Sequence, residues 1–412
     1  MEVVHPRCAG LDVHKKTVVA CVMVPGRKEV QTFGTVTDEL LRLADWLEQE
    51  QVTHVAMEST GVYWKPIYNV LESTGLELLV VNAQHIKAVP GRKTDVKDAE
   101  WIADLLKHGL VRASFIPSRP QRELRELVRY RKGLTEQRGH VVQRIQKLLE
   151  GANIKLSDVA SDVVGVSGLA MLRALASGEE DAERLAEMGK SQLRNKRHEL
   201  RLALRGSFGQ HQRFMLKNQL GLLEFLDEQI AMLNQEVERR LRPFEPLLER
   251  LRAIPGIGPR NSEQILAEIG TDMSRFPTDS HFASWAKLCP GNDESAGKRM
   301  SGKTGHGSRW LRATMVEAAW SATRVKNSYF AAQYHRLVPR RGKRRAAVAV
   351  AHSMLIVIYH LIKDGTVYQD LGPHHFDELD RKRITHRAVQ RLQSLGFEVS
   401  LRDVAAVSQF SG

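Results

Sequence analysis

The first hundred residues constrain the fold most, because they alternate short β-rich runs with amphipathic segments. Residues 8–14, 17–24 and 29–36 are rich in strand-forming side chains, and a Pro25-Gly26 pair marks a turn after the second run. Residues 38–51 carry apolar side chains at helical spacing. Two further strands are expected at 54–58 and 77–82, with a helix between them. The sequence therefore predicts an α/β domain built on a five-stranded sheet.

Three strands, a helix, and two strands separated by a helix form the element order of a ribonuclease-H-like sheet. This fold assignment is made by analogy. Beyond the sheet, residues 118–149 read as one long helix that contains Gly133 and Gly139. A leucine-patterned helical stretch at 219–251 is expected to be interrupted at Pro243 and Pro246. Together the two stretches predict an antiparallel helical or coiled-coil arm.

Shifts in composition divide the chain into four expected parts. Residues 1–115 form the α/β domain, and residues 116–250 form the helical arm. Residues 251–365 form a mainly α-helical domain, and residues 366–412 form a tail with a helix near 377–395 that ends at Gly396. The sequence assigns no chemistry to the tail or to the Gly- and Ala-rich segment at 165–190.

The charge balance points to polyanionic partners. The chain has 61 Lys and Arg against 48 Asp and Glu, a formal net charge of +13. Residues 112–147 hold ten basic and three acidic residues, and residues 295–345 hold thirteen basic residues and one acidic residue, Glu317. A solvated helix surface explains the first of these segments equally well. For the second, we expect a large share of the affinity for nucleic acid.

The chain is expected to be a soluble protein of a reducing compartment. Its three cysteines lack metal-binding spacing, and their odd number argues against a disulfide framework. The first residues contain no basic segment followed by an apolar one, so no signal peptide is predicted. The longest apolar run, residues 346–362, has 17 residues and contains two histidines, which favours a buried helix over a membrane span. A cytoplasmic, nucleoid-associated prokaryotic protein without a membrane partner is the expectation.

Four carboxylates stand out by their positions in the predicted elements. Asp12 lies within the first strand, Glu58 ends the fourth, and Asp95 and Asp98 open a helix three residues apart, on one helical face. Each residue alone has an ordinary explanation, since Asp95 could cap the helix and Glu58 could pair with Lys65. Gathered at one end of a sheet, the four would repel one another unless a divalent cation neutralised them. Hard oxygen ligands suit Mg²⁺, and a pair of such ions can clamp both oxygens of a phosphoryl transfer.

Three separated segments of the N-terminal domain carry a resemblance to a known family. They are Gly10-Leu-Asp-Val-His-Lys15, Met57-Glu-Ser-Thr-Gly-Val-Tyr-Trp64 and Lys93-Thr-Asp-Val-Lys-Asp-Ala99. They resemble the DEDD-type insertion-sequence transposases of the IS110 family, also described as bridge-RNA-guided recombinases. The resemblance implies a RuvC-like domain in which Asp12, Glu58, Asp95 and Asp98 bind Mg²⁺.

The C-terminal half resembles the transposase domain of the same family. The segment Ile254-Pro-Gly-Ile-Gly-Pro259 has the look of a helix-hairpin-helix turn, and similarity returns at residues 283–291 and 294–303. The resemblance implies a serine nucleophile at Ser295. Because Ala296 separates Ser295 from Gly297, whereas the family commonly has Ser directly before Gly, Ser301 before Gly302 is a rival position. The alternative to a covalent step is a Gly- and Lys-rich loop that only binds phosphate.

Basic residues around the serine are expected to contact nucleic acid. Close to it, three cations could neutralise charge on a pentavalent phosphate: Lys298, Arg299 and Lys303. Further contacts to the nucleic-acid backbone are expected from Arg309 and, on the long helix, from Arg125 and Arg129.

The resemblance implies an RNA-guided DNA recombinase that mobilises its own insertion sequence. The expected chemistry is Mg²⁺-assisted attack of the serine on a DNA phosphodiester, a phosphoserine intermediate, strand exchange and religation. The expected partners are donor and target DNA, a guide noncoding RNA and further copies of the chain in a dimer or tetramer. The first alternative is a hydrolytic RuvC-like nuclease specific for DNA structure, which would use water in place of the serine. The second alternative is a nucleic-acid-binding protein without catalysis.

Overall fold

The computed structural model describes residues 2–59, 61–82, 98–289, 293–295, 298–301, 304–305, 307–379 and 381–401, and every structural statement below refers to these residues. The chain divides into two compact units, Met1–Ser118 and Arg119–Gly412. The first unit contains the sheet, and the second is mainly helical. Each unit is described by itself.

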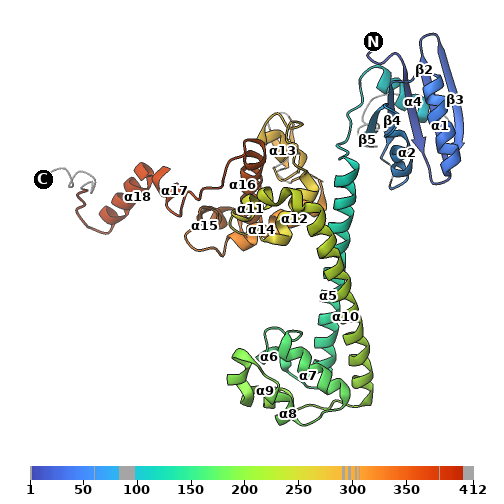
Figure 1. Cartoon of the computed structure of the whole chain (residues 1–412). Coiled ribbons are helices and arrows are strands. Elements are labelled where there is room, and N and C mark those ends of the chain that lie inside the picture. The colour runs from blue at the N-terminus through green and yellow to red at the C-terminus, as the bar shows by residue number, and fades with distance from the viewer. Residues whose placement is uncertain are drawn as a thin grey trace. The chain divides into compact units, whose positions relative to one another are not determined.

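The first unit is a five-stranded mixed sheet with helices on both faces (Figure 1). The strand order is β3-β2-β1-β4-β5, in which β1 runs antiparallel to β2 and parallel to β4. The elements are β1 (Cys8–Val13), β2 (Thr17–Val24), β3 (Arg27–Gly34), α1 (Thr37–Gln49), β4 (His54–Glu58), α2 (Trp64–Leu71), β5 (Glu77–Val81) and α4 (Asp98–Lys107). The α/β sheet domain predicted from the sequence is therefore confirmed.

Strand alternation explains the three layers of this unit. Along β1, Ala9, Leu11 and Val13 belong to the core under α1 and α2, whereas Cys8 packs with residues of α4. The third strand begins two residues earlier than predicted, because Val24 pairs with Arg27 directly across the Pro25-Gly26 turn. Because the hairpin turn has only two residues, β3 begins directly after it.

The second unit begins with the two long helices of the arm, α5 (Arg119–Gly151) and α10 (Gln210–Leu241). The two helices pack antiparallel, since Glu123 pairs with Arg240 and Arg138 pairs with Asp227. Gly133 and Gly139 have open space around them, and α5 continues through both. The antiparallel arm is therefore confirmed, as is the interruption at the prolines, where a short 3-10 helix, η3 (Arg242–Phe244), leads into α11 (Glu245–Arg252).

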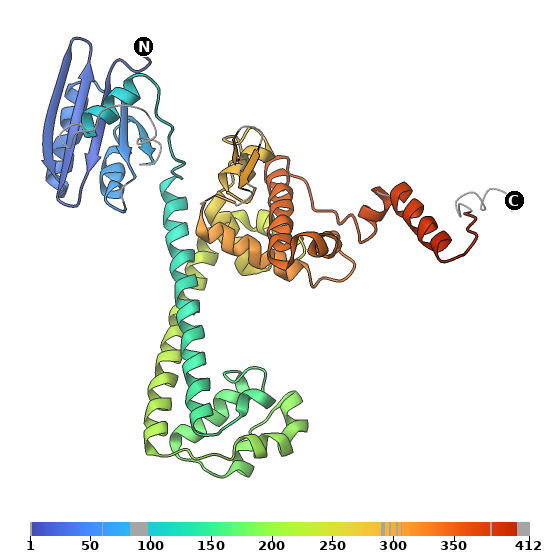
Figure 2. The same cartoon turned by 180° about the vertical axis from the view of Figure 1, so that it is seen from behind.

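A small helical unit connects the end of α5 to the start of α10 and lies at one end of the arm (Figure 2). It has its own hydrophobic core, in which Met171, Leu185 and Leu200 pack against Ile145 and Leu216 of the arm. We call it the tip unit. Its elements are α6 (Leu156–Val159), α7 (Val166–Ser177), α8 (Ala182–Glu187), η2 (Ser191–Lys196) and α9 (Arg197–Ala203). The sequence did not predict this separate core.

In the rest of the second unit, α13 (Asp279–Trp285), α14 (Arg309–Ala322), α15 (Tyr329–Arg341) and α11 pack on α16 (Lys343–Lys363). Helix α12 (Pro259–Ile269) packs on α14, α11 and α5, and the hairpin β6 (Asp293–Ser295) and β7 (Lys298–Ser301) lies between α13 and α14 in the chain. Among the described residues, α16 is the one helix long and apolar enough to cross a membrane. Its apolar side chains, including Val350, Met354 and Ile358, lie in the core of this domain, as predicted. Beyond α16, the tail forms α17 (His375–Leu379) and α18 (Arg381–Ser394), followed by Gly396 in a left-handed conformation.

Candidate active site

Two carboxylates lie at the same edge of the sheet, at the carboxyl ends of neighbouring parallel strands. Leu11 of β1 lies opposite Met57 of β4, so the next residue on each strand is Asp12 and Glu58. Alternation along β1 places Asp12 on the face that carries α4. The Asp12 side chain is only 16% exposed. The fold therefore gives two of the predicted residues a shared position.

The close approach of α4 to β1 brings a third carboxylate to this edge. A Cβ atom at Gly10 would lie 2.3 Å from the backbone nitrogen of Ala103 and 2.4 Å from the carbonyl oxygen of Ala99. Only glycine therefore fits beneath α4 two residues before Asp12. Asp98 opens this helix, whose first turn is also tied to β3 by an ion pair of 2.8 Å between Lys28 and Glu100.

The three carboxylates influence one another electrostatically. The pKa of Asp12 is raised, mainly because burial disfavours its charged form. The negative charges of Asp98 and Glu58 raise this pKa further, while His14, whose Nε2 lies 3.1 Å from Asp12 Oδ2, lowers it. Since an ionised Asp12 is disfavoured here, a bound cation would stabilise the charged form.

The chemistry of these donors fits a hard divalent cation such as Mg²⁺, which prefers carboxylate oxygens. Within the described ranges, no three His, Cys, Asp or Glu side chains are grouped closely enough to hold a metal ion. The fourth predicted ligand, Asp95, lies outside the described residues. The described part of the site therefore supplies suitable oxygens but not a complete ligand set.

The two candidate serines lie on opposite strands of one hairpin. Ser295 ends β6 and pairs with Lys298, the first residue of β7. Ser301 ends β7 and pairs with Asp293, at the open end of the hairpin. The backbone of Arg299 is described in β7, whereas Lys303 lies outside the described residues. Only backbone positions are described in this hairpin, and they place Lys298 directly across from Ser295.

Glycines anchor the segment that follows the hairpin. A Cβ atom at Gly307 would lie 2.8 Å from the carbonyl oxygen of Ala286, and one at Gly305 would lie 3.0 Å from the Lys287 side chain. These two glycines are therefore explained by packing against the end of α13. Immediately after them, the exposed Arg309 begins α14, with its guanidinium carbon 4.8 Å from the centroid of the Trp310 ring.

Arg125 and Arg129 have protein partners. Arg125 donates from Nε to the carbonyl oxygen of Ala267, over 2.9 Å, and from a terminal nitrogen to the carbonyl of Glu268. Burial lowers the pKa of this guanidinium to about 10. Arg129 makes a bidentate ion pair with the Glu268 carboxylate, at 2.7 and 2.8 Å. In this structure both arginines attach α5 to the end of α12.

Glu268 holds these contacts together, although its role was not predicted from the sequence. Its side chain is 1% exposed, and besides Arg129 it accepts a hydrogen bond of 3.0 Å from Ser308. Ser308 also caps α14 by accepting from the backbone N–H of Leu311. Glu268 thus links α5 of the arm to the N-terminus of α14. A charged residue inside the apolar run Ile265-Leu-Ala-Glu-Ile269 was the signal that could have indicated it.

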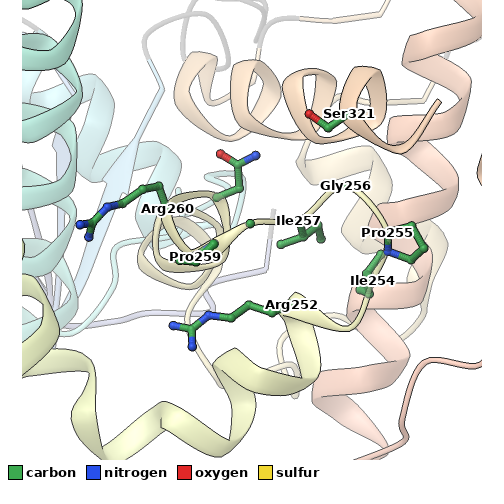
Figure 3. A pocket seen from close by; sticks show the side chains of 10 residues that line it. Arg252, Ile254, Pro255, Gly256, Ile257, Pro259, Arg260 and Ser321 are labelled. Atoms are coloured by element: carbon green, nitrogen blue, oxygen red, sulfur yellow. The ribbon is translucent and has the colours of Figure 1, made fainter. Parts of the chain in front are cut away.

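The predicted helix-hairpin-helix turn joins α11 to α12 and borders an open pocket of about 540 Å³ (Figure 3). Gly256 has a φ of +88°, and a Cβ atom there would lie 2.3 Å from the carbonyl oxygen of Ala318. This glycine therefore serves the packing of the turn on α14. Gly258, which precedes α12, has open space around it, and Arg252 and Arg260 line the same pocket.

Comparison with known proteins identifies the class. A transposase family model matches residues 9–154, and a model described as "Transposase IS116/IS110/IS902 family" matches residues 248–335. The chain is similar to the "Insertion element IS110 uncharacterized 43.6 kDa protein" of Streptomyces coelicolor, at 28% identity over 37% of each chain. It is also similar to the "Transposase for insertion sequence element IS1111A" of Coxiella burnetii, at 25% identity over 76% of this chain and 79% of the relative.

The first matched segment contains the acidic edge of the sheet, by which we mean Asp12, Glu58 and Asp98, and the second contains the turn, the hairpin and α14 of the helical domain. The chain is therefore a transposase, a class of enzymes that act on DNA. Within that class, it belongs to the IS110 family of insertion-sequence transposases.

Proposed function

We propose that this protein mobilises its own insertion sequence as an RNA-guided DNA recombinase that uses a serine nucleophile. The observation that carries the proposal is the position of Asp12, Glu58 and Asp98, from two strands and a helix, near one edge of the sheet, where the charges of Glu58 and Asp98 raise the pKa of Asp12. A structural role alone would not require a largely buried carboxylate on which two other carboxylates act.

In this proposal, the N-terminal domain is RuvC-like and holds Mg²⁺ through Asp12, Glu58, Asp98 and Asp95. When bound, the ion supplies Lewis acidity and neutralises charge at a DNA phosphate. The His14 ring orients the Asp12 carboxylate through their 3.1 Å contact. The parallel pairing of β1 with β4 fixes the positions of Asp12 and Glu58 at one edge.

The covalent step is assigned to Ser295. Its hydroxyl oxygen forms a bond to a DNA phosphorus atom while the bond between that phosphorus and the leaving deoxyribose oxygen breaks, and the proton lost by the serine is balanced by the one that the leaving oxygen takes up. Lys298, Arg299, Lys303 and Arg309 supply positive charge for the phosphate. The pairing of Ser295 with Lys298 supports this assignment, because it puts a cation directly across the hairpin from the nucleophile.

We further propose that the arm dimerises the protein. Helix α10 carries a second apolar stripe of exposed side chains, namely Phe214 (65%), Leu222 (41%), Phe225 (54%) and Met232 (62%). At about 100° per residue, Phe214, Phe225 and Met232 fall within about 20° of one another. The residues of α10 that pack on α5, such as Leu216 and Leu223, lie on the other side of the helix. Phe225→Asp should weaken self-association in light scattering, whereas Ala231→Asp should not, because the exposed Ala231 lies about 100° around the helix from Phe214.

An adduct assay tests the chemistry. Labelled DNA that carries the joined ends of the element and its insertion site is incubated with the protein, Mg²⁺ and RNA transcribed from the flanks of the element. We expect an SDS-resistant, protease-sensitive band that is absent from Ser295→Ala and retained in Ser301→Ala. Because both serines belong to one hairpin, the second variant is a matched control.

The assay also separates the alternatives. Cleaved DNA without an adduct, unchanged by Ser295→Ala, would identify a hydrolytic nuclease. Loss of the band only in Ser301→Ala would move the nucleophile to Ser301. An adduct that forms equally well without the flank RNA would refute RNA guidance. DNA binding without cleavage or adduct would indicate a binding protein without catalysis.

A further inference from the structure

The tip unit carries a strongly basic surface that the proposed chemistry does not use. Between residues 190 and 205 the chain has six basic residues and one acidic residue, Glu199. Five exposed cations, in η2, α9 and the residues beside them, define what we call the tip basic surface: Lys190, Arg194, Lys196, Arg197 and Arg205. None of the five side chains takes part in an ion pair among the described residues.

The neighbouring cations of the tip unit behave differently. Arg201 pairs with Glu183 at 3.2 Å, Arg213 pairs with Glu180, and Arg184 lies 3.6 Å from both Glu179 and Asp181. The acidic side chains of α8 and its N-terminal flank are thus largely engaged. The five cations of the tip basic surface therefore retain uncompensated charge.

The fold presents these charges on a supported surface. Leu200 is fully buried and Leu204 is 3% exposed, and both belong to the core of the tip unit. Arg197 is the first residue of α9, Arg205 follows the end of this helix, and both side chains are exposed. Because the underlying core is packed, removing exposed charges here should leave the fold intact.

We propose that the tip basic surface binds the phosphate backbone of duplex DNA. All five side chains are Lys or Arg, and η2 and α9 contain no Phe, Tyr or Trp on which unpaired bases could stack. Such a surface fits the regular phosphates of a duplex and makes sequence-independent contacts. Helix α5 has 33 residues and spans about 50 Å, so this contact is remote from the serine-bearing hairpin.

The test measures how binding of the full-length protein depends on salt. A 60-base-pair DNA duplex of mixed sequence is titrated between about 50 and 200 mM salt, where phosphate contacts dominate the dependence. The test variant is Arg194→Gln/Lys196→Gln/Arg197→Gln. The control variant, Arg173→Gln/Arg184→Gln/Arg239→Gln, removes the same charge from exposed arginines that have acidic partners. Both are made in the Ser295→Ala background, so the result does not depend on the proposed nucleophile.

Log affinity falls as log salt rises, and each lost phosphate contact makes this negative slope shallower by about one. We expect the slope of the test variant to be shallower by about three and its affinity to be at least tenfold weaker, while the control keeps the slope of the parent protein. Equal losses in both variants would refute the proposal in favour of net charge. An unchanged test variant would refute it outright. A loss confined to duplex RNA of the same sequence would show that the surface serves RNA and would overturn the assignment to DNA.

Discussion

Replacing Gly10 with alanine should separate the carboxylates of the candidate site while leaving most of the fold in place. The added Cβ atom would meet backbone atoms of Ala99 and Ala103 at 2.4 and 2.3 Å. Ordinary contacts begin near 3.4 Å. Since backbone atoms cannot rotate away, α4 must move from β1 by about 1 Å, and Asp98 must move with it.

The energetic cost follows from this displacement. Overpacking of a close-packed core costs about 1–3 kcal/mol, and we expect the upper part of that range because two backbone atoms are in the way. A metal site tolerates distance changes of about 0.2 Å, several times less than the expected shift. Activity should therefore suffer far more than the free energy of unfolding.

Urea unfolding and Mg²⁺-dependent adduct formation measure the two effects. We expect the first unit of Gly10→Ala, which contains the sheet, to unfold at lower urea concentration and the variant to form adduct at least a hundredfold more slowly. Gly139→Ala is the matched control, because Gly139 has open space within α5 and alanine should stabilise a helix by up to about 1 kcal/mol. A Gly10→Ala protein with unchanged stability and full activity would show that α4 does not pack on β1 as described.

Three further predictions concern buried charge and thiols. Burial raises the pKa of Asp12, so its ionised form costs folding free energy above that pKa, and the cost disappears as the pH falls through it. Asp12→Asn should therefore raise the urea midpoint at pH 7 without divalent cations while abolishing adduct formation, and a lowered midpoint would contradict this. Burial raises the pKa of Cys8 to about 11 and of Cys21 to about 12, so a thiol reagent at pH 8 should label only the partly exposed Cys289 in the folded protein, and fast labelling of a second thiol would count against the predicted burial. Glu268→Ala leaves its arginine partner without a counter-ion and should lower the free energy of unfolding by about 3 kcal/mol or more in urea titrations; a change below 1 kcal/mol would mean that the ion pair does not hold α5 to α12.

The local patterns of the sequence predicted the elements well. Strands β2 and β4 have the expected bounds, because short runs rich in apolar residues mark them clearly in the sequence. The long helix α5 was predicted to within two residues at each end. The acidic edge was predictable because Asp12 and Glu58 interrupt or end strands that are otherwise apolar.

Pairings between distant elements could not be predicted from local patterns. Arg125 and Arg129 lie on a basic helix face, which is compatible with nucleic acid, yet their partners belong to α12, about 140 residues away. The core of the tip unit was also beyond reach, since its short helices bury their apolar faces against two helices of the arm. Such outcomes depend on tertiary packing, and a single sequence carries no direct signal of it.

The two ends of the tip unit lie next to each other, as the ends of an inserted segment do. The backbone N–H of Ser207 donates to the carbonyl oxygen of Ala152 over 2.9 Å, and that of Lys155 donates to the carbonyl oxygen of Ala203 over 2.8 Å. Because α5 ends where α10 begins, a short loop could join the two helices with little loss of chain entropy. The segment from residue 152 to residue 209 is thus a natural module for deletion, transplantation or exchange, and a shortened chain would retain both ends of the arm in their present register.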